Sequence, residues 1–455
     1  QAASIRGFNT GSGSVRFTAS NLTLGNSAQV AAGMLLPPVA LGSLVFDAEE
    51  ITLGAHAVRL EGFADARLTA SSRILLGSGS LQASGDLMLS SGLLTARSAA
   101  KYQFISSGLL QVKRPEAVTG QPKFGGFGAD VTLQAASMRV NGDITLASGK
   151  LTLHALTGDL VLGDSGASLI DLGGTSTTFA DAIRYTSGGS VNLLADLGSV
   201  RLEANSTISV AARMGGGNAG TIHVKTPEGG FGLQGAIRGG AGAKGVGGIF
   251  TLDTELIAGG SLASLDAILN EGDFDQARSY RIRTGEVKVD GTARSLIYQV
   301  SADGGSISVS GSVDASGQNG GRIELKATGS LVVRNGALLD ASAQEFNSAG
   351  KGGAIVLEAG NSRNGTIDPS AGLDLREGAE RSIFAPRGWR LTTSYASRPS
   401  AARSRARPTF LSKGQNFTPS LAREPSPARS RPVSKTTPPL SSARPAPRPP
   451  VTRRC

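Results

Sequence analysis

A repeated unit constrains the fold of this chain more than any other feature. The stretch "QVSADGGSISVSGSVDAS" lies over "ELKATGSLVVRNGALLDAS", within two successive units at residues 298–321 and 322–353. Each unit reads as short strands of alternating apolar and polar residues, separated by Gly, Asp, Asn or Ser. Because one such unit cannot bury its own apolar face, the repeat predicts that each unit stacks on its neighbours. The positions expected to match are Val300 with Leu325, Ile307 with Leu331, Val309 with Val333, Gly311 with Gly336, and Asp314 with Asp340.

The length of the unit drifts along the chain while the strand-like phrases persist. The second unit is the longer one, and we place its extra residues in "EFNSAGKGG", after its last strand. Similar phrases occur upstream, beginning with "GSVRFTA" at Gly13, and a third unit opens at "AIVLEAGNS", residues 354–362. A closed propeller or barrel needs evenly sized blades, which this chain lacks. We therefore predict an all-β solenoid of parallel strands over residues 1–385.

The composition agrees with thin, stacked layers of strand. Glycine is abundant at 63 residues and aromatic residues make up only 5%, so the core must consist of Val, Ile, Leu and Ala. The only cysteine is Cys455, which excludes an intramolecular disulfide and a cysteine-based zinc site. The longest apolar stretch near the start, residues 30–46, is interrupted by Pro37 and Pro38, so we expect no transmembrane segment. The chain begins with Gln1 and shows no basic-then-apolar leader, and we expect it to be an interior or C-terminal piece of a longer protein.

Two segments depart from the strand pattern. Residues 229–250 are rich in glycine, and we expect them to form a flexible loop that leaves the solenoid. Residues 261–272 predict a short helix insertion that lies across the solenoid and buries its apolar face. The helix prediction depends on Ser261 as N-cap, on Leu262, Leu265 and Leu269 along one face, and on Gly272 beyond the end.

The character of the chain changes at Pro386. Residues 386–455 contain 15 of the 45 Lys and Arg and a single acid, Glu424, so this tail produces the formal charge of +10 and the preceding body is mildly acidic. Thirteen of the 19 prolines also lie there, and apolar residues are too few to offset the entropy of ordering. We predict a disordered tail, with an out-of-frame extension as the alternative origin. The tail's aromatic residues, Trp389, Tyr395, Phe410 and Phe417, do not alternate with Arg, so no specific nucleic-acid partner is expected.

The phrases "GGSISVSGSVDASG", "GGRIELKATGSLVVRNGALLDASA" and "GGAIVLEAG", with the helix-bearing segment before them, resemble the large filamentous haemagglutinin-type exoproteins of Gram-negative bacteria. The likeness covers most of residues 1–385 and is densest over 250–376. It implies a right-handed parallel β-helix, export through a partner outer-membrane transporter barrel, and use as an adhesin or stalk. The family's N-terminal secretion domain with its Asn-Pro motif, and the Arg-Gly-Asp tripeptide, do not occur in this sequence. Recognition by the barrel or by an integrin is therefore assigned to no residue.

Few residues suggest a catalytic or metal-binding role. His56, His154 and His223 each lie in a strand-like phrase without a second His or Cys at ligand spacing, so exposed strand positions are favoured over metal binding. Asp314 and Asp340 occupy equivalent positions, as paired glycosidase carboxylates do. Their shared "DAS" context instead favours a turn in which the carboxylate accepts a backbone N–H two residues on.

Three further motifs carry no function in our interpretation. "GGAGAKG" at Gly239 resembles a phosphate-binding loop, but Lys244 is followed by glycine rather than Ser or Thr. The Gly-Gly-x-Gly runs lack the Asp of a calcium-binding nonapeptide. The four Asn-x-Ser/Thr sites, at Asn21, Asn205, Asn364 and Asn416, are expected by chance in a chain so rich in Ser and Thr.

The sequence thus favours a secreted or surface-exposed structural protein that binds a host cell, a sister cell or matrix through the loops and outer face of a solenoid. We expect no catalytic residues, no cofactor and no metal, and the binding residues stay undefined. A β-helical polysaccharide lyase or hydrolase is the second hypothesis, since unrelated functions share one fold. A third is the stalk of a contact-dependent toxin, whose active domain would lie beyond residue 455.

Overall fold

The computed structural model describes residues 2–8, 11–26, 41–118, 123–345 and 352–360 with their side chains. It also describes the backbone of five later strands between Thr366 and Ser412. The chain divides into Gln1–Gln415 and Asn416–Cys455, and every described residue belongs to the first unit.

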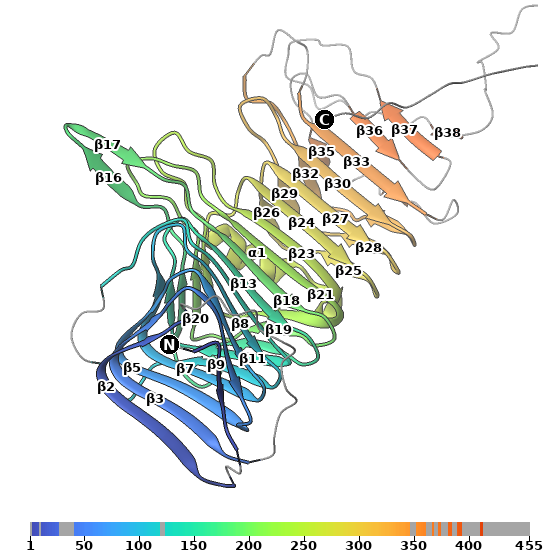
Figure 1. The fold of residues 1–455 in the computed structure, drawn as a ribbon. Coiled ribbons are helices and arrows are strands. Elements are labelled where there is room, and N and C mark those ends of the chain that lie inside the picture. Colours follow the sequence, from blue (N-terminus) through green and yellow to red (C-terminus); the bar gives the residue numbers. More distant parts are fainter. Residues whose placement is uncertain are drawn as a thin grey trace, which may run out of the picture. The chain divides into compact units, whose positions relative to one another are not determined.

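The described part is an all-β parallel β-helix, as the repeat predicts (Figure 1). One strand from almost every coil contributes to a first ladder, in which all neighbours are parallel. Its members are β1 (Ser4–Arg6), β4 (His56–Glu61), β6 (Gly79–Ala83), β8 (Lys101–Ser106), β10 (Asp130–Ala135), β13 (Lys150–Ala155), β18 (Ser190–Ala195), β21 (Thr221–Leu233), β23 (Ile249–Leu256), β24 (Ala277–Ile282), β27 (Ile297–Ala302), β30 (Arg322–Ala327) and β33 (Ala354–Ala359).

The rest of each coil forms a second and a third ladder. Near the N-terminus single long strands, β2 (Ser14–Leu24), β3 (Ser43–Leu53), β5 (Asp65–Leu76) and β7 (Asp86–Ala96), serve both ladders. The second ladder continues through β9 (Leu109–Lys113), β11 (Ser137–Asn141), β14 (Leu160–Leu162), β19 (Val200–Leu202) and the end of β21. The third continues through β12 (Asp143–Thr145), β15 (Ser168–Asp171), β20 (Ser206–Ser209) and β22 (Ala236–Arg238).

Both of these ladders break after β21 and β22 and begin again further along the chain. The second resumes as β25 (Val287–Val289), β28 (Ile307–Val309), β31 (Leu331–Val333) and β34 (Thr366–Ile367). The third resumes as β26 (Thr292–Arg294), β29 (Ser312–Asp314), β32 (Leu338–Asp340) and β35 (Gly372–Asp374). Only the first ladder passes the break without interruption.

The register of the repeat agrees with four of the five matches expected from the sequence. Val300 pairs with Leu325, Ile307 with Leu331, Val309 with Val333, and Asp314 with Asp340. The match of Gly311 with Gly336 is wrong, because Ser312 pairs with Leu338 and Gly311 therefore lies opposite Ala337. The turn after Val333 is two residues longer than the turn after Val309, and Gly336 adopts a left-handed φ of 83° within it. Some of the extra length thus lies between strands, while much of "EFNSAGKGG" is outside the described residues.

Inward-facing aliphatic residues of successive coils form the core. One column along the first ladder has less than 3% of each side chain exposed. Burial of one such aliphatic side chain contributes about 1.5–3 kcal/mol, and each coil supplies several of them. The column consists of one aromatic residue, Tyr280, and of the aliphatic residues Leu133, Leu153, Leu193, Val224, Leu252, Val300, Leu325 and Leu357.

The expectation of a flexible loop over residues 229–250 is wrong for most of that segment. Gly229–Leu233 belongs to β21, and β22 follows at Ala236–Arg238. Phe231 and Ile237 are buried, and they anchor these strands in the core. Only residues 239–248 form a loop, and Gly239 and Gly248 pack so closely on the Phe274 ring that an added Cβ would lie 2.9 and 2.7 Å from it. Glycine is needed here for close packing, which composition alone does not distinguish from flexibility.

The predicted helix is present as α1 (Ala263–Glu271), directly after the 3₁₀ turn Ala258–Gly260. It starts later than expected, because Leu262 rather than Ser261 is the N-cap. Ser261 still contributes, since its hydroxyl accepts the Ala263 N–H at 3.2 Å and donates to Asp290 at 2.7 Å. The face with Leu262, Leu265 and Leu269 is buried, and Gly272 ends the helix, as predicted.

Helix α1 occupies the break in the third ladder. It contacts β22 on one side and β26 on the other, so it stands where one coil would otherwise supply a strand. The Gly239 N–H donates to the Gly272 carbonyl at 2.6 Å, and the Asn270 amide donates to the Thr292 carbonyl at 2.6 Å. Among the residues that the structure describes, no helix has the length and apolar character needed to cross a bilayer.

Two short strands, β37 and β38, lie within residues 386–455, which were predicted to be disordered. β36 (Arg381–Phe384), β37 (Trp389–Thr393) and β38 (Phe410–Ser412) form an antiparallel sheet that straddles the expected boundary at residue 385. Each of these strands holds two or more apolar residues, a local pattern that the many Pro and Arg of the tail obscure. The other residues of the tail are outside the described part of the chain.

Candidate functional site

The three histidines lie on different strands of the first ladder. His56 is exposed at the start of β4, and His154 Nε2 lies 2.9 Å from an Asp196 carboxylate oxygen. Burial lowers the pKa of the half-buried His223, Asp253 acts to raise it, and Lys225 lowers it further. No group of three or more His, Cys, Asp or Glu side chains suited to a metal ion occurs within the residues described.

Asp314 and Asp340 have the turn role predicted from the "DAS" context. The Ser316 N–H donates to Asp314 Oδ1 at 2.9 Å, and the Ser342 N–H donates to Asp340 Oδ1 at 2.8 Å. Asp374 follows them in register on β35. The carboxylates of Asp314 and Asp340 therefore shape the corners after β29 and β32.

Within the described residues, the remaining sequence motifs gather at no common site. Lys244 lies in the loop 239–248 with a left-handed φ of 61°. Asn21 lies on β2 and Asn205 in the turn before β20, whereas Asn364 and Asn416 fall outside the described residues. Trp389 and Phe410 lie on β37 and β38, and the other two tail aromatics fall outside the described residues too.

A buried polar cluster on α1 was missed by the sequence analysis. The Asp266 carboxylate accepts hydrogen bonds from Arg278 Nη1 at 3.0 Å, Tyr280 Oη at 2.7 Å and Tyr298 Oη at 2.8 Å. All four side chains are at most 2% exposed. Arg278 also donates to the Phe274 carbonyl at 2.8 Å and to the Asn270 amide oxygen at 2.7 Å.

Burial dominates the electrostatics of this cluster. It raises the pKa of Asp266, against the charge of Arg278 and the phenol hydrogen bonds, and it raises the pKa of both tyrosines well above their usual value. The hydrogen bonds join α1 to two successive coils, β24 and β27, and enclosure in the core leaves no access for a substrate. The cluster is thus a structural attachment for the helix.

A second group of charges covers the outer face of the first ladder. Asp253 accepts hydrogen bonds from Arg283 at 2.8 and 3.0 Å, and Arg281 pairs with Asp303 at 2.7 Å. Burial acts to raise the pKa of Asp253, but the hydrogen bond and charge of Arg283 outweigh it and lower the pKa. These cations and carboxylates neutralise one another across neighbouring coils.

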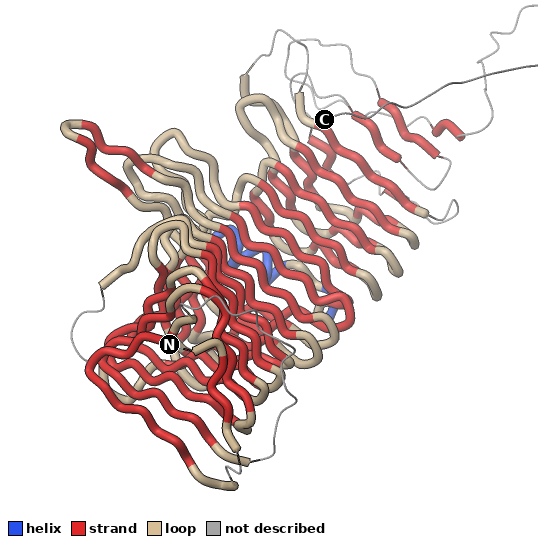
Figure 2. Tube along the Cα trace, viewed as in Figure 1, coloured by secondary structure: helices blue, strands red, loops and turns tan. Residues whose placement is uncertain are grey.

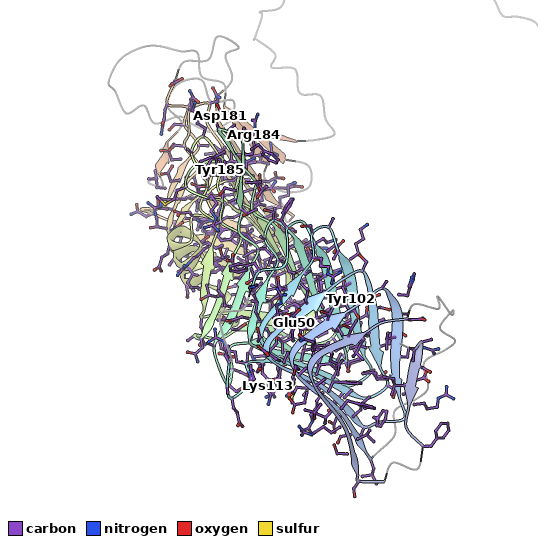
Figure 3. The ribbon with its side chains drawn as sticks, turned by 60° about the vertical axis from the view of Figure 1, so that its left-hand side comes forward. Glu50, Tyr102, Lys113, Asp181, Arg184 and Tyr185 are labelled. Carbon is purple, nitrogen blue, oxygen red and sulfur yellow. The ribbon has the colours of Figure 1, made fainter. Side chains whose placement is uncertain are left out.

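A hairpin leaves the solenoid in the coil between β13 and β18 of the first ladder. Lys150 pairs with Ser190, a separation of 40 residues, and the intervening chain contains β16 (Ser176–Phe179) and β17 (Ala182–Tyr185). The two strands pair antiparallel, and all of their residues are exposed. Figure 1 shows the hairpin projecting from the stacked strands, and Figure 3 labels its Asp181, Arg184 and Tyr185.

The hairpin belongs to a row of stacked loops, which we call the loop edge. The loop edge comprises the segments that directly precede five successive strands of the first ladder. These segments are largely tan in Figure 2. The Thr186 hydroxyl lies 2.5 Å from the Ser148 hydroxyl, and the Tyr185 ring covers Gly215 so closely that an added Cβ would lie 2.2 Å from its hydroxyl oxygen. The Ala243 N–H in turn donates to the Met214 carbonyl at 3.0 Å. The loop-edge residues are 123–129, 146–149, 172–189, 210–220 and 239–248.

The loop edge exposes large apolar side chains on a scaffold that is internally hydrogen bonded. Met214 is 92% exposed and Phe179 is 63% exposed. An exposed group of large apolar side chains rimmed by polar residues is typical of an interaction site. The exposed apolar residues of the loop edge are Phe124, Phe127, Phe179, Ile183, Tyr185, Met214 and Val246.

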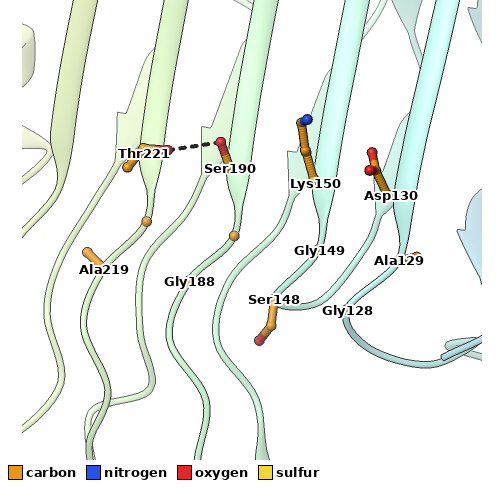
Figure 4. Close-up of a pocket in the computed structure, with 12 residues that line it drawn as sticks. Gly128, Ala129, Asp130, Ser148, Gly149, Lys150, Gly188, Ser190, Ala219 and Thr221 are labelled. Atoms are coloured by element: carbon orange, nitrogen blue, oxygen red, sulfur yellow. Dashed lines mark hydrogen bonds between the residues drawn. The ribbon is translucent and has the colours of Figure 1, made fainter. Parts of the chain in front are cut away.

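A groove of about 410 Å³ runs along the foot of the loop edge, where four successive coils enter the first ladder (Figure 4). Each coil contributes three consecutive residues, and the third of each set is the first residue of β10, β13, β18 or β21. The sets are 128–130, 148–150, 188–190 and 219–221.

Comparison with known proteins returns no match for this chain among family models, curated proteins or solved structures. The likeness to filamentous haemagglutinin-type exoproteins therefore remains a prediction from the sequence. The hairpin and the groove were not foreseen. The only available signal for the groove was a small residue before each strand phrase, as in "GADVTL", "SGKLTL", "GGSVNL" and "AGTIHV".

Proposed function

We propose that this chain is a secreted or surface-exposed β-solenoid of a Gram-negative bacterium that mediates attachment, as an adhesin or as the stalk of one. The observation that carries the proposal is the loop edge, where ordered loops and a hairpin expose apolar side chains. Hydrogen bonds between neighbouring loops hold these side chains in place before contact, which lowers the entropy that binding costs. The receptor would be a glycan or a protein of a host cell, a sister cell or matrix.

Export fits the same architecture. Each coil buries its apolar residues against the coil before it, so coils can add one at a time to a stack that has already formed. A partner outer-membrane transporter barrel is the export route that the sequence resemblance implies. No residue of this chain is assigned to recognition of that barrel.

Attachment can be tested with beads coated with the whole chain. We expect them to adhere to epithelial cells, to bacteria or to extracellular matrix more strongly than beads coated with albumin. Replacement of Phe179 and Ile183 by Ser should reduce adhesion severalfold, because both side chains project from the hairpin. Replacement of Leu197 and Leu256, which are similarly exposed away from the loop edge, is the matched control and should leave adhesion unchanged. Equal adhesion of beads with and without the protein would refute the adhesin role.

The stalk alternative predicts a different result from the same beads. A stalk that only provides reach would hold a distal domain away from the cell and would not adhere by itself. Adhesion that depends on the hairpin therefore distinguishes binding from reach.

A further inference from the structure

We infer that the groove at the foot of the loop edge binds a neutral, linear polysaccharide chain lying across the strands, along the direction in which the coils stack. The inference rests on the proposed attachment function and names the chemistry of the ligand. It starts from the periodicity of the groove. Four coils present the same three positions, and parallel strands repeat at about 4.8 Å, so the groove is about 14 Å long from first to last strand. A polymer with repeated polar groups can use equivalent positions along that length.

The floor of the groove consists of backbone. An added Cβ at Gly189 would lie 2.1 Å from the Gly149 carbonyl oxygen, and one at Gly220 would lie 1.8 Å from the Gly189 carbonyl oxygen. Larger residues would therefore push the coils apart, and the column of small residues keeps the floor low. A groove of this volume falls within the range of sites that bind small molecules.

Backbone donors of the groove are already used within the fold. The N–H groups of Lys150, Ser190 and Thr221 donate to carbonyls of the preceding coil at 2.7–3.0 Å. The N–H groups of Gly189 and Gly220 donate to Leu172 and Val210 at 2.7 and 2.8 Å. An extended peptide binds a sheet through free backbone groups at an edge strand, and these strands are paired on both sides. A ligand must therefore be recognised by side chains.

The side chains of the third residue in each set can form hydrogen bonds with the hydroxyl groups of a ligand. Asp130 is an acceptor, Lys150 is a donor, and Ser190 and Thr221 are both, with the Thr221 hydroxyl donating to Ser190 at 2.9 Å. Among the described residues, the Asp130 carboxylate and the Lys150 ammonium form no hydrogen bond or ion pair with another side chain. Figure 4 shows these four side chains in a row on successive strands.

Charge and flanking residues define the ligand further. Asp130 and Lys150 are the only charged residues that line the groove, and their charges cancel, so the site favours a neutral chain over an acidic one. Phe127, half exposed, directly precedes the groove residue Gly128, so an aromatic residue adjoins one end of the groove. A hydroxyl-rich, uncharged and extended polymer is the ligand class that matches all of these features.

The test uses the whole chain and isothermal titration with neutral oligosaccharides of glucan, xylan, mannan and chitin type in increasing lengths. At least one series should bind, with an affinity that rises with length until the chain spans the groove and then stays constant. Asp130→Ala and Lys150→Ala should each weaken binding about tenfold, the effect of losing one hydrogen bond to a charged group. Lys101→Ala is the matched control, because Lys101 is the equivalent exposed residue one coil before the groove and lies outside it. The affinity of the Lys101→Ala variant for the oligosaccharide should equal that of the wild type.

Several outcomes would overturn the inference. The inference fails if no neutral series binds, or if Lys101→Ala loses as much affinity as Asp130→Ala and Lys150→Ala. It also fails if the protein prefers acidic oligosaccharides and this preference disappears with added salt. Thermal unfolding of each variant checks that the fold is retained, which we expect because Lys101 and Lys150 are exposed and Asp130 is only partly buried. Bead adhesion without oligosaccharide binding would refute the groove and leave attachment intact. Oligosaccharide binding without bead adhesion would support the groove as a binding site and refute attachment.

Discussion

Two coils of the solenoid carry an element that is not a ladder strand, and they use it in opposite ways. In one coil, α1 turns inward, fills a break in the third ladder and buries Asp266 among Arg278 and two tyrosines. In the other, β16 and β17 turn outward and expose every residue. Both insertions interrupt the same repeat. The difference shows that an insertion stabilises the fold where its polar groups are satisfied inside the core, whereas an insertion whose apolar groups face water leaves them available for contact.

The largest expected effect comes from the inward insertion. Asp266→Ala leaves Arg278 buried without its carboxylate, and loss of one partner of a buried ion pair costs about 3–5 kcal/mol. We expect the free energy of unfolding, measured by urea denaturation, to fall by that amount. The control is Asp303→Ala, which removes one of the two carboxylate partners of the half-exposed Arg281 and should cost less than about 1 kcal/mol. Equal losses for the two variants would mean that α1 is not held by Asp266.

The tyrosine hydroxyl groups that bind Asp266 should also stabilise the fold, by a smaller amount. Tyr298→Phe keeps the ring in the core but removes the donor 2.8 Å from Asp266 Oδ2. Loss of a hydrogen bond to a buried charged group costs about 1.5–3 kcal/mol. Tyr185→Phe on the exposed hairpin should leave the midpoint of thermal unfolding unchanged. A similar shift for both would contradict the contrast between the two insertions.

Surface charge pairs should respond to pH in a defined direction. Burial acts to raise the pKa of Glu324, but hydrogen bonds from Lys326 and Arg322 outweigh it and lower the pKa from 4.5 to about 2. A lowered pKa stabilises the fold above about pH 4.5, and this contribution disappears as pH falls toward 2. We expect Glu324→Gln to lower the free energy of unfolding by about 1 kcal/mol at neutral pH, because the half-exposed Arg322 and Lys326 are screened by solvent. The difference from wild type should vanish in acid, and a difference that stays constant with pH would refute this account of the pair.

The smallest effect on stability is expected for the outward insertion. Phe179→Ser and Ile183→Ser alter exposed side chains without core contacts, so the free energy of unfolding should change by less than about 0.5 kcal/mol. Adhesion of coated beads should nevertheless fall severalfold. Loss of stability comparable to that of Asp266→Ala would show that the hairpin packs on the solenoid.

The sequence predicted the parallel stack because strand periodicity survives changes in coil length. Val300 and Leu325 align on their alternation alone, whereas Gly311 and Gly336 do not, because turn length is set by local backbone geometry rather than by burial. The helix was predicted from Leu262, Leu265 and Leu269, which recur with helical spacing. Asp266 gave no signal, since an acidic residue in the first turn of a helix usually faces solvent and satisfies the helix dipole.

The candidate binding surface was much harder to predict than the fold. The hairpin strands are four residues each, and the first consists mostly of Ser and Thr, so it resembles the polar turns around it. The groove arises from one small residue per coil, spaced by 20 to 40 residues, and only the stacking register brings these residues together. Glycine in residues 229–250 was misinterpreted for the same reason, because its contacts are with other coils.

The register of successive coils is the central claim, and disulfide cross-linking tests it directly. In a chain with Cys455→Ser, the pair Ser301→Cys and Lys326→Cys places the new thiols on directly paired positions of β27 and β30. Neighbouring Cα atoms in parallel strands are about 4.8 Å apart, within the span of a disulfide. The pair Gln299→Cys and Lys326→Cys is displaced by two residues, at about 8 Å, which exceeds that span. The account predicts a rapid disulfide in the first pair and none in the second, and the reverse result, or no cross-link in either, would contradict it.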